Sequence, residues 1–152
     1  MKSVKTPCIG ICSTVFGDEV CRGCKRFVHE VIDWNTYNNE QKQLVKDRLE
    51  RLADQVVTGK LQVKDQAKFL TSLTVAEIDV EQSEVVLILE LLRKAAKQVT
   101  TFSDHGMLAL AEYQQYSANE LKELIDMEVH QLSTATYHKN FKRHSKEYVG
   151  EK

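Results

Sequence analysis

Apolar residues recur every three or four positions over most of the chain after residue 38, and this spacing predicts a mainly helical protein. The first long helix is predicted to begin at Asn38 or Asn39, which can cap it, and to end before Gly59. Its apolar positions are Val45, Leu49, Leu52 and Val56. A single proline, Pro7, and the many Leu, Glu, Lys and Gln residues beyond favour helices in the remainder.

The segment 60–137 is predicted to form a helical bundle. A second helix is indicated by an apolar series that comprises Val63, Ala67, Leu70 and Leu73. Thr74–Glu77 and Asp79–Gln82 both fit capping boxes, and they favour a helix start over the alternative of a short strand at 73–80. The run from Val85 to Val99 is apolar on nearly all sides, so we expect it to be the most buried helix.

Two more helices are predicted before the chain becomes basic at its end. Asp104–Tyr113 is expected to form a short helix, and Ser117–Glu120 is a capping box that leads into a sharply amphipathic pattern. That pattern comprises Leu121, Leu124, Ile125, Val129 and Leu132. From His138 onward the chain is basic and polar, with Phe141 and Tyr148 as its aromatic residues. We expect a flexible, solvated tail, with an arm that touches phosphate or an acidic partner as the alternative.

Composition limits the class of protein. The 152 residues are 42% hydrophobic and 28% charged, which suffices to bury one sizeable core or two small ones. A net charge of −1 and an isoelectric point near 6.5 argue against a dedicated nucleic-acid-binding protein, which is usually strongly basic. The longest apolar run, Val85–Leu89, is far shorter than the roughly 18 residues of a membrane span. We therefore expect a soluble, cytoplasmic protein that does not enter the membrane.

All four cysteines lie within the first 24 residues, and they predict one metal site. A metal held by four thiolates needs sulfur atoms that converge from the corners of a tetrahedron, and two closely spaced pairs can supply them. Within the second pair, Gly23 can take a positive φ and let the chain fold back. Between the pairs, Gly17-Asp18 predicts a turn. The predicted metal ligands are Cys8, Cys12, Cys21 and Cys24.

Three other uses of these cysteines are less consistent with the sequence. Disulfides would need an oxidising compartment, whereas the N-terminus has no signal-peptide pattern. Lipid attachment at Cys12 is disfavoured because the bulky Ile11 precedes it. A thioredoxin-like redox pair at Cys21 and Cys24 would leave Cys8 and Cys12 unexplained and lacks the surrounding strand–helix pattern. Disulfide and dithiol chemistry stay as the alternatives to a metal site.

The sequence does not separate zinc from an iron–sulfur cluster. Either centre is negatively charged when four thiolates bind it, and nearby basic residues can offset that charge. These residues are Lys5, Arg22, Lys25 and Arg26. Three residues separate the first two cysteines and two separate the second pair, a spacing that matches neither a zinc ribbon nor a bacterial ferredoxin. The expected cofactor is zinc, slightly favoured, or an iron–sulfur cluster.

This N-terminal motif resembles a bacterial family called DUF1289, whose members are often labelled predicted iron–sulfur proteins. The resemblance covers about the first 55 residues and is carried by Thr6–Cys12, Gly17-Asp18, Cys21–Arg26, Glu30–Trp34 and the helix that follows. It implies that the four cysteines are shared ligands and that Trp34 belongs to the module. Phe27 departs from the family pattern, which more often has threonine there, and the C-terminal part lies outside the pattern.

These features divide the chain into three predicted parts. Residues 1–59 form a cysteine-rich metal-binding module with one long helix, 60–137 a helical bundle, and 138–152 the basic tail. The region before the long helix holds few large apolar side chains, so metal binding is expected to supply the folding free energy of the knuckle. Trp34 is expected to pack the knuckle onto that helix, and His29 to have a supporting or surface role.

A closed four-thiolate site leaves no coordination position for an activated water, and the chain shows no catalytic motif, so enzymatic activity is not expected. The predicted function is that of a non-enzymatic metal-binding protein whose structural four-cysteine knuckle and helical body serve protein–protein interaction or regulation, with an unidentified protein partner. Two alternatives stay open. One is an iron–sulfur redox or electron-transfer protein, and the other is a nucleic-acid-binding zinc knuckle that uses Arg22, Lys25, Arg26 and the basic tail.

Overall fold

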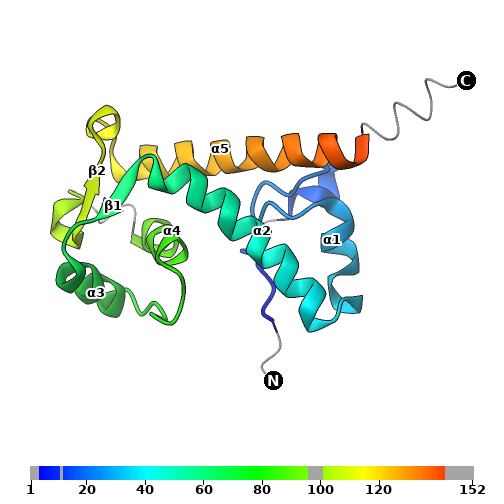
Figure 1. Cartoon of the computed structure of the whole chain (residues 1–152), viewed down its shortest axis with the longest axis horizontal. Coiled ribbons are helices and arrows are strands. Elements are labelled where there is room, and N and C mark those ends of the chain that lie inside the picture. The colour runs from blue at the N-terminus through cyan, green and yellow to red at the C-terminus, as the bar shows by residue number, and fades with distance from the viewer. Residues whose placement is uncertain (1–3, 11, 96–100, 143–152) are drawn as a thin grey trace, which may run out of the picture. The chain divides into compact units, whose positions relative to one another are not determined.

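The computed structural model describes residues 4–10, 12–95 and 101–142, and it confirms a mainly helical fold (Figure 1). The α-helices are α1 (Val28–Asp33), α2 (Asn39–Thr58), α3 (Gln66–Val75), α4 (Glu84–Ala95) and α5 (Ala118–Tyr137). Two short strands, β1 (Leu61–Val63) and β2 (Met107–Ala109), pair antiparallel with Leu61 opposite Ala109. The shorter helical turns are η1 (Ser13–Phe16), η2 (Trp34–Thr36), η3 (Ser103–His105), η4 (Ala111–Tyr113) and η5 (His138–Lys142). None of the helices described is long and apolar enough to cross a membrane.

The chain forms two compact units. The first unit contains the described residues of Met1–Leu52 and Glu128–Lys152, and the second contains those of Ala53–Met127. Helices α2 and α5 each contribute residues to both units. The first unit therefore combines segments that lie far apart in the sequence.

The starts of α2 and α5 confirm the predictions made from their capping residues. At α2, Asn38 Oδ1 accepts from the Gln41 amide at 2.8 Å, while Gln41 Oε1 accepts from the Asn38 amide at 2.9 Å. At α5, Ser117 and Glu120 exchange the same two bonds at 3.1 and 3.2 Å. Each pair satisfies two amides that the first turn of a helix leaves without partners, so the signal is local and readable from sequence.

The core of the second unit is built around α4. Ile88, Leu91 and Leu92 of this helix are almost completely buried. Fully buried side chains from the other elements of the unit include Leu61, Phe69, Leu73, Met107 and Leu121. The helix predicted from Val85 to Val99 is confirmed as far as Ala95, and residues 96–100 lie outside the described part of the chain.

The short helix predicted at Asp104–Tyr113 is wrong, because this segment forms η3, strand β2 and η4. Gly106 turns the chain into the strand with φ +74°, and its carbonyl oxygen accepts from the Lys64 and Asp65 amides at 2.8 and 3.1 Å. A Cβ at this position would clash with the Asp65 carbonyl oxygen and lie 2.7 Å from the Phe69 nitrogen. The pairing partner β1 is more than 40 residues away in sequence, so helical periodicity could not reveal the strand.

The capping box predicted at Thr74–Glu77 also proves wrong, because α3 ends there. Glu77 adopts the left-handed conformation with φ 58° and its amide donates to the Thr74 carbonyl, while the Ile78 amide donates to the Leu73 carbonyl. This is a Schellman ending, in which the buried Leu73 and Ile78 make the accompanying apolar pair. Burial of these two side chains outweighs the capping preference of Thr74 and Glu77.

Candidate metal centre

Cys21 and Cys24 lie in the turn of a short hairpin in the first unit. Val20 and Phe27 form an isolated antiparallel bridge, and the Cys21 amide donates to the Arg26 carbonyl at 2.9 Å. Lys25 follows the pair with φ 68°, and its amide donates to the Cys21 carbonyl at 2.9 Å. The left-handed residue of this turn is thus Lys25 and not Gly23, for which the sequence predicted a positive φ. Lys25 Nζ also donates to the carbonyl oxygens of Arg22 and Gly23. We call residues 19–28 the cysteine hairpin.

The Cys21 sulfur is surrounded by hydrogen-bond donors. Its side chain is 1% exposed, and burial by itself raises the thiol pKa. The backbone amides of Cys24, Ser13 and Gly23, together with the Cys24 side chain, donate to the sulfur and lower the pKa, with a net result of about 7. These donors stabilise a thiolate, which is the form that binds a metal.

The Cys24 sulfur has one cationic neighbour. Burial raises the pKa of this thiol, and the nearby Cys21 adds to the rise. Arg26 opposes both effects, because its Nε donates to Cys24 Sγ at 3.2 Å. Arg26 is itself 4% exposed, so the cation sits inside the hairpin rather than in solvent. If Cys24 is also a thiolate, the Arg26 guanidinium lies within hydrogen-bond distance to balance its negative charge.

The first cysteine pair is not gathered onto this hairpin. Cys8 is exposed and its Sγ accepts from the Gly10 amide at 3.4 Å, while the half-buried Cys12 contacts Thr14 Oγ1 at 3.0 Å. Within residues 4–10, 12–95 and 101–142, no three His, Cys, Asp or Glu side chains are arranged to hold a metal ion. The structure thus brings two of the four predicted ligands together and does not show the four-cysteine knuckle.

A buried ion pair supports the hairpin. Glu30, 5% exposed, accepts a hydrogen bond from the Phe27 amide at 2.9 Å and so caps α1 where it begins at the end of the hairpin. The same carboxylate accepts hydrogen bonds from both terminal nitrogens of Arg48 on α2, at 2.7 and 2.5 Å. The Arg48 guanidinium also lies 4.0 Å from the centre of the Phe27 ring. The sequence pattern marked Phe27 and Glu30 only as motif positions and did not predict their contacts with Arg48, although Glu30 stands at the third position of the helix, where a capping carboxylate belongs.

Trp34 packs as predicted. Its side chain is 6% exposed, and its ring centre lies 5.0 Å from the Arg26 guanidinium and 5.6 Å from Lys42 Nζ of α2. It therefore joins the cysteine hairpin to α2 through cation–π contacts. His29 packs against two aromatic rings, those of Phe27 at 5.9 Å and Phe141 at 5.0 Å. These contacts agree with a supporting role for His29.

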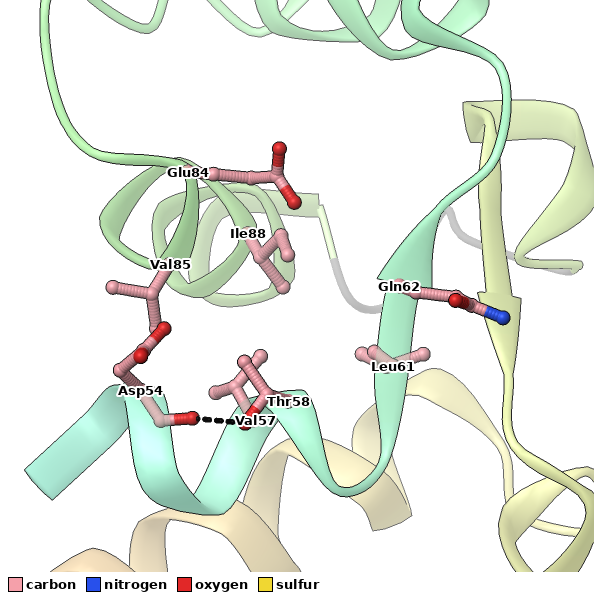
Figure 2. A pocket seen from close by; sticks show the side chains of 8 residues that line it. All are labelled: Asp54, Val57, Thr58, Leu61, Gln62, Glu84, Val85 and Ile88. Carbon is pink, nitrogen blue, oxygen red and sulfur yellow. Dashed lines mark hydrogen bonds between the residues drawn. The ribbon is translucent and has the colours of Figure 1, made fainter.

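Two hollows lie apart from the cysteines. A cleft of about 270 Å³ lies in the second unit between α2, β1 and α4, and Figure 2 shows the side chains that line it. Its apolar residues are Val57, Leu61, Val85 and Ile88, and the exposed Asp54 and Glu84 also line it. A hollow of about 210 Å³ in the first unit lies between residues 17–20 and a face that carries His130 and Thr134 of α5 and His138 of η5. Neither hollow is lined by a cysteine, so the candidate metal ligands belong to neither.

The comparisons with known proteins bear on the N-terminal segment alone. Residues 6–53 match the family model described as protein of unknown function, DUF1289. This confirms the resemblance expected from the cysteine motif, and the remainder of the chain is outside the match. No curated protein and no solved structure matches the chain. The DUF1289 segment includes all four cysteines, the cysteine hairpin, Trp34 and most of α2.

Proposed function

We propose that this protein is a non-enzymatic metal-binding protein in which Cys8, Cys12, Cys21 and Cys24 hold one structural metal centre. The helical body and the DUF1289 segment serve protein–protein interaction or regulation. The observation that carries the proposal is the environment of Cys21. The Cys21 sulfur is buried, accepts hydrogen bonds from several backbone amides and lies beside a second buried sulfur. This environment stabilises the thiolate form, which is the form that binds a metal.

The first pair reaches this centre through Ser13. The Ser13 amide donates to the Cys21 sulfur, and Ser13 Oγ accepts from the Arg22 amide at 2.8 Å. Cys12 directly precedes Ser13, so its backbone is already tethered beside the hairpin. In this proposal, metal binding completes the site by bringing the Cys8 and Cys12 sulfurs to Cys21 and Cys24, and it contributes folding free energy on the order of 10 kcal/mol. Cys21 and Cys24 are then the two ligands that the fold already holds close together.

Zinc is slightly favoured as the metal. A tetrahedral site filled by four thiolates has no position for a water or a substrate, so its role is structural and not catalytic. We place the protein in the cytoplasm, where free thiols stay reduced and available to a metal. The partner is proposed to be a protein rather than a nucleic acid. Lys25 and Arg26 are 6% and 4% exposed and their charged groups are bonded inside the hairpin, which leaves them poorly placed for phosphates.

The test is the metal content and visible spectrum of anaerobically purified protein, compared with Cys21→Ser. One equivalent of zinc in a colourless protein, lost in the variant, is the expected result. A brown protein whose visible absorbance disappears in the variant would replace zinc with an iron–sulfur cluster and move the function to electron transfer. Full metal occupancy and an unchanged fold in Cys21→Ser would contradict the ligand assignment.

A further inference from the structure

The C-terminal half of α5 lies beside the N-terminal segment in Figure 1, and it contacts both sides of the cysteine hairpin. On the strand that enters the turn, His130 Nε2 lies 3.2 Å from the carbonyl oxygen of Val20, the residue before Cys21. On the strand that leaves it, the Phe27 ring meets the rings of Tyr137 and Phe141 with centroids 5.3 and 5.6 Å apart. These three α5 and η5 residues, His130, Tyr137 and Phe141, form what we call the C-terminal clamp.

The clamp encloses Phe27. This side chain is 3% exposed, because Tyr137 and Phe141 meet its ring edge-on and the Arg48 guanidinium lies over it at 4.0 Å. Tyr137 and Phe141 also contact each other at 5.2 Å. The π-helical turn η5 continues α5 beyond Tyr137 and carries Phe141 to the same ring cluster. Phe27 stands three residues after Cys24, so the cluster fixes the strand that leaves the turn in which Cys24 lies.

The hairpin needs such support. One isolated bridge between two short strands is marginally stable in water, and its order must come from packing against something else. Residues from Glu128 onward belong to the same compact unit as the hairpin, although they lie some 75 residues beyond the end of the DUF1289 match at residue 53. The N-terminal segment of this chain is thus completed by a segment that the family model does not include.

We propose that His130, Tyr137 and Phe141 are positioning residues of the metal centre. The clamp holds the two strands of the cysteine hairpin, and with them Cys21 and Cys24, in a ligating arrangement before the metal arrives. This inference rests on the proposed metal-binding function. It means that residues near the C-terminus raise the metal affinity of the N-terminal cysteine site.

Metal affinity in the full-length protein tests the clamp. Zinc is titrated against a chromophoric chelator for the wild type, Phe141→Ala and the control Leu132→Ala, which truncates a side chain of α5 that is 37% exposed. We expect Phe141→Ala to bind one equivalent of zinc about tenfold more weakly than the wild type does, because losing an aromatic contact of this kind costs roughly that factor. Leu132→Ala should stay within about twofold of wild type. Equal affinities for Phe141→Ala and Leu132→Ala would overturn the proposal.

Hydrogen exchange on the metal-free protein shows whether the clamp orders the cysteine hairpin without any contribution from the metal. The amides of Cys21 and Lys25, which bond across the hairpin, should exchange faster in Phe141→Ala, while the amides of α4 keep their wild-type rates. A purely structural loss would speed both sets and would count against a positioning role. If Phe141→Ala does not fold, His130→Ala makes the same test from the Val20 side. A wild type that binds no zinc defeats the proposed function, and the exchange rates then still decide whether the clamp orders the hairpin.

Discussion

Arg48 of α2 binds Glu30 of α1 with two parallel hydrogen bonds of 2.7 and 2.5 Å. The Glu30 side chain is 6% exposed and that of Arg48 is 20% exposed, so water screens this pair little. The same carboxylate accepts a hydrogen bond from the amide of Phe27, near the end of the cysteine hairpin. One side chain therefore joins the end of the hairpin, the start of α1 and the middle of α2.

Neutralising Glu30 should destabilise the protein. We expect Glu30→Gln to lower the free energy of unfolding by about 2–3 kcal/mol, because Arg48 keeps a largely buried charge without its partner. The control is Asp18→Asn, which removes the exposed Arg22–Asp18 pair at 3.3 Å and should cost less than about 1 kcal/mol. Urea unfolding followed by circular dichroism measures both variants. Equal losses would show that burial of the Glu30 pair has no energetic consequence.

A methyl group at Gly106 should disrupt the β1–β2 pairing. We expect Gly106→Ala to cost at least about 2 kcal/mol, since φ +74° strains any L side chain and the new Cβ meets the backbone at Asp65 and Phe69. Gly59→Ala is the matched control, because the nearest atom to its Cβ would be 3.7 Å away. Thermal unfolding of the two variants gives the comparison. A Gly106→Ala protein as stable as Gly59→Ala would contradict the described turn.

The Cys21 thiol should ionise near neutral pH in the reduced, metal-free protein. Its pKa of about 7 is below the ordinary value of 9.0, so the folded chain binds the proton less tightly than the unfolded chain does. The resulting stabilisation is complete above about pH 9 and is lost as the pH falls through about 7. Thiolate absorbance at about 240 nm should therefore rise with a midpoint near pH 7.

Cys21→Ser is the control for this titration, because it should remove the low-pH rise and leave the absorbance change of the other thiols. A wild-type curve with no component below about pH 8 would mean that the amides of Ser13, Gly23 and Cys24 do not stabilise the thiolate.

The two cysteine pairs should differ in their effect on the metal-free fold. Cys24→Ala removes the sulfur of a residue that is 8% exposed, and this sulfur accepts a hydrogen bond from Arg26 Nε. The free energy of unfolding of the metal-free protein should therefore fall by about 1–3 kcal/mol. Cys8→Ala removes an exposed sulfur and should leave the metal-free stability within about 0.5 kcal/mol of wild type. Both variants should bind metal less tightly in a chelator competition. Unchanged metal affinity in Cys8→Ala would remove that residue from the ligand set.

The sequence located the features whose signals are local. The caps at Asn38 and Ser117 lie within three residues of their partners, and both helices begin where these residues predict. Val85 to Leu92 is apolar on most faces, and this run became the buried helix of the second unit. The clustered cysteine motif identified the DUF1289 segment, because spacing within a short stretch is preserved in any fold.

Tertiary structure decided what depends on distant partners. Strand β2 exists because Gly106 fits against Asp65 and its neighbours pair with β1, and no window around residues 104–113 contains that information. The end of α3 depends on the burial of Leu73 and Ile78, which outweighs a local capping pattern. The surroundings of Phe27 are the clearest case, because its partners Arg48, Tyr137 and Phe141 are 21 to 114 residues away. Short-range patterns specify caps and candidate ligands, whereas packing free energy is gained between side chains that only the folded chain brings together.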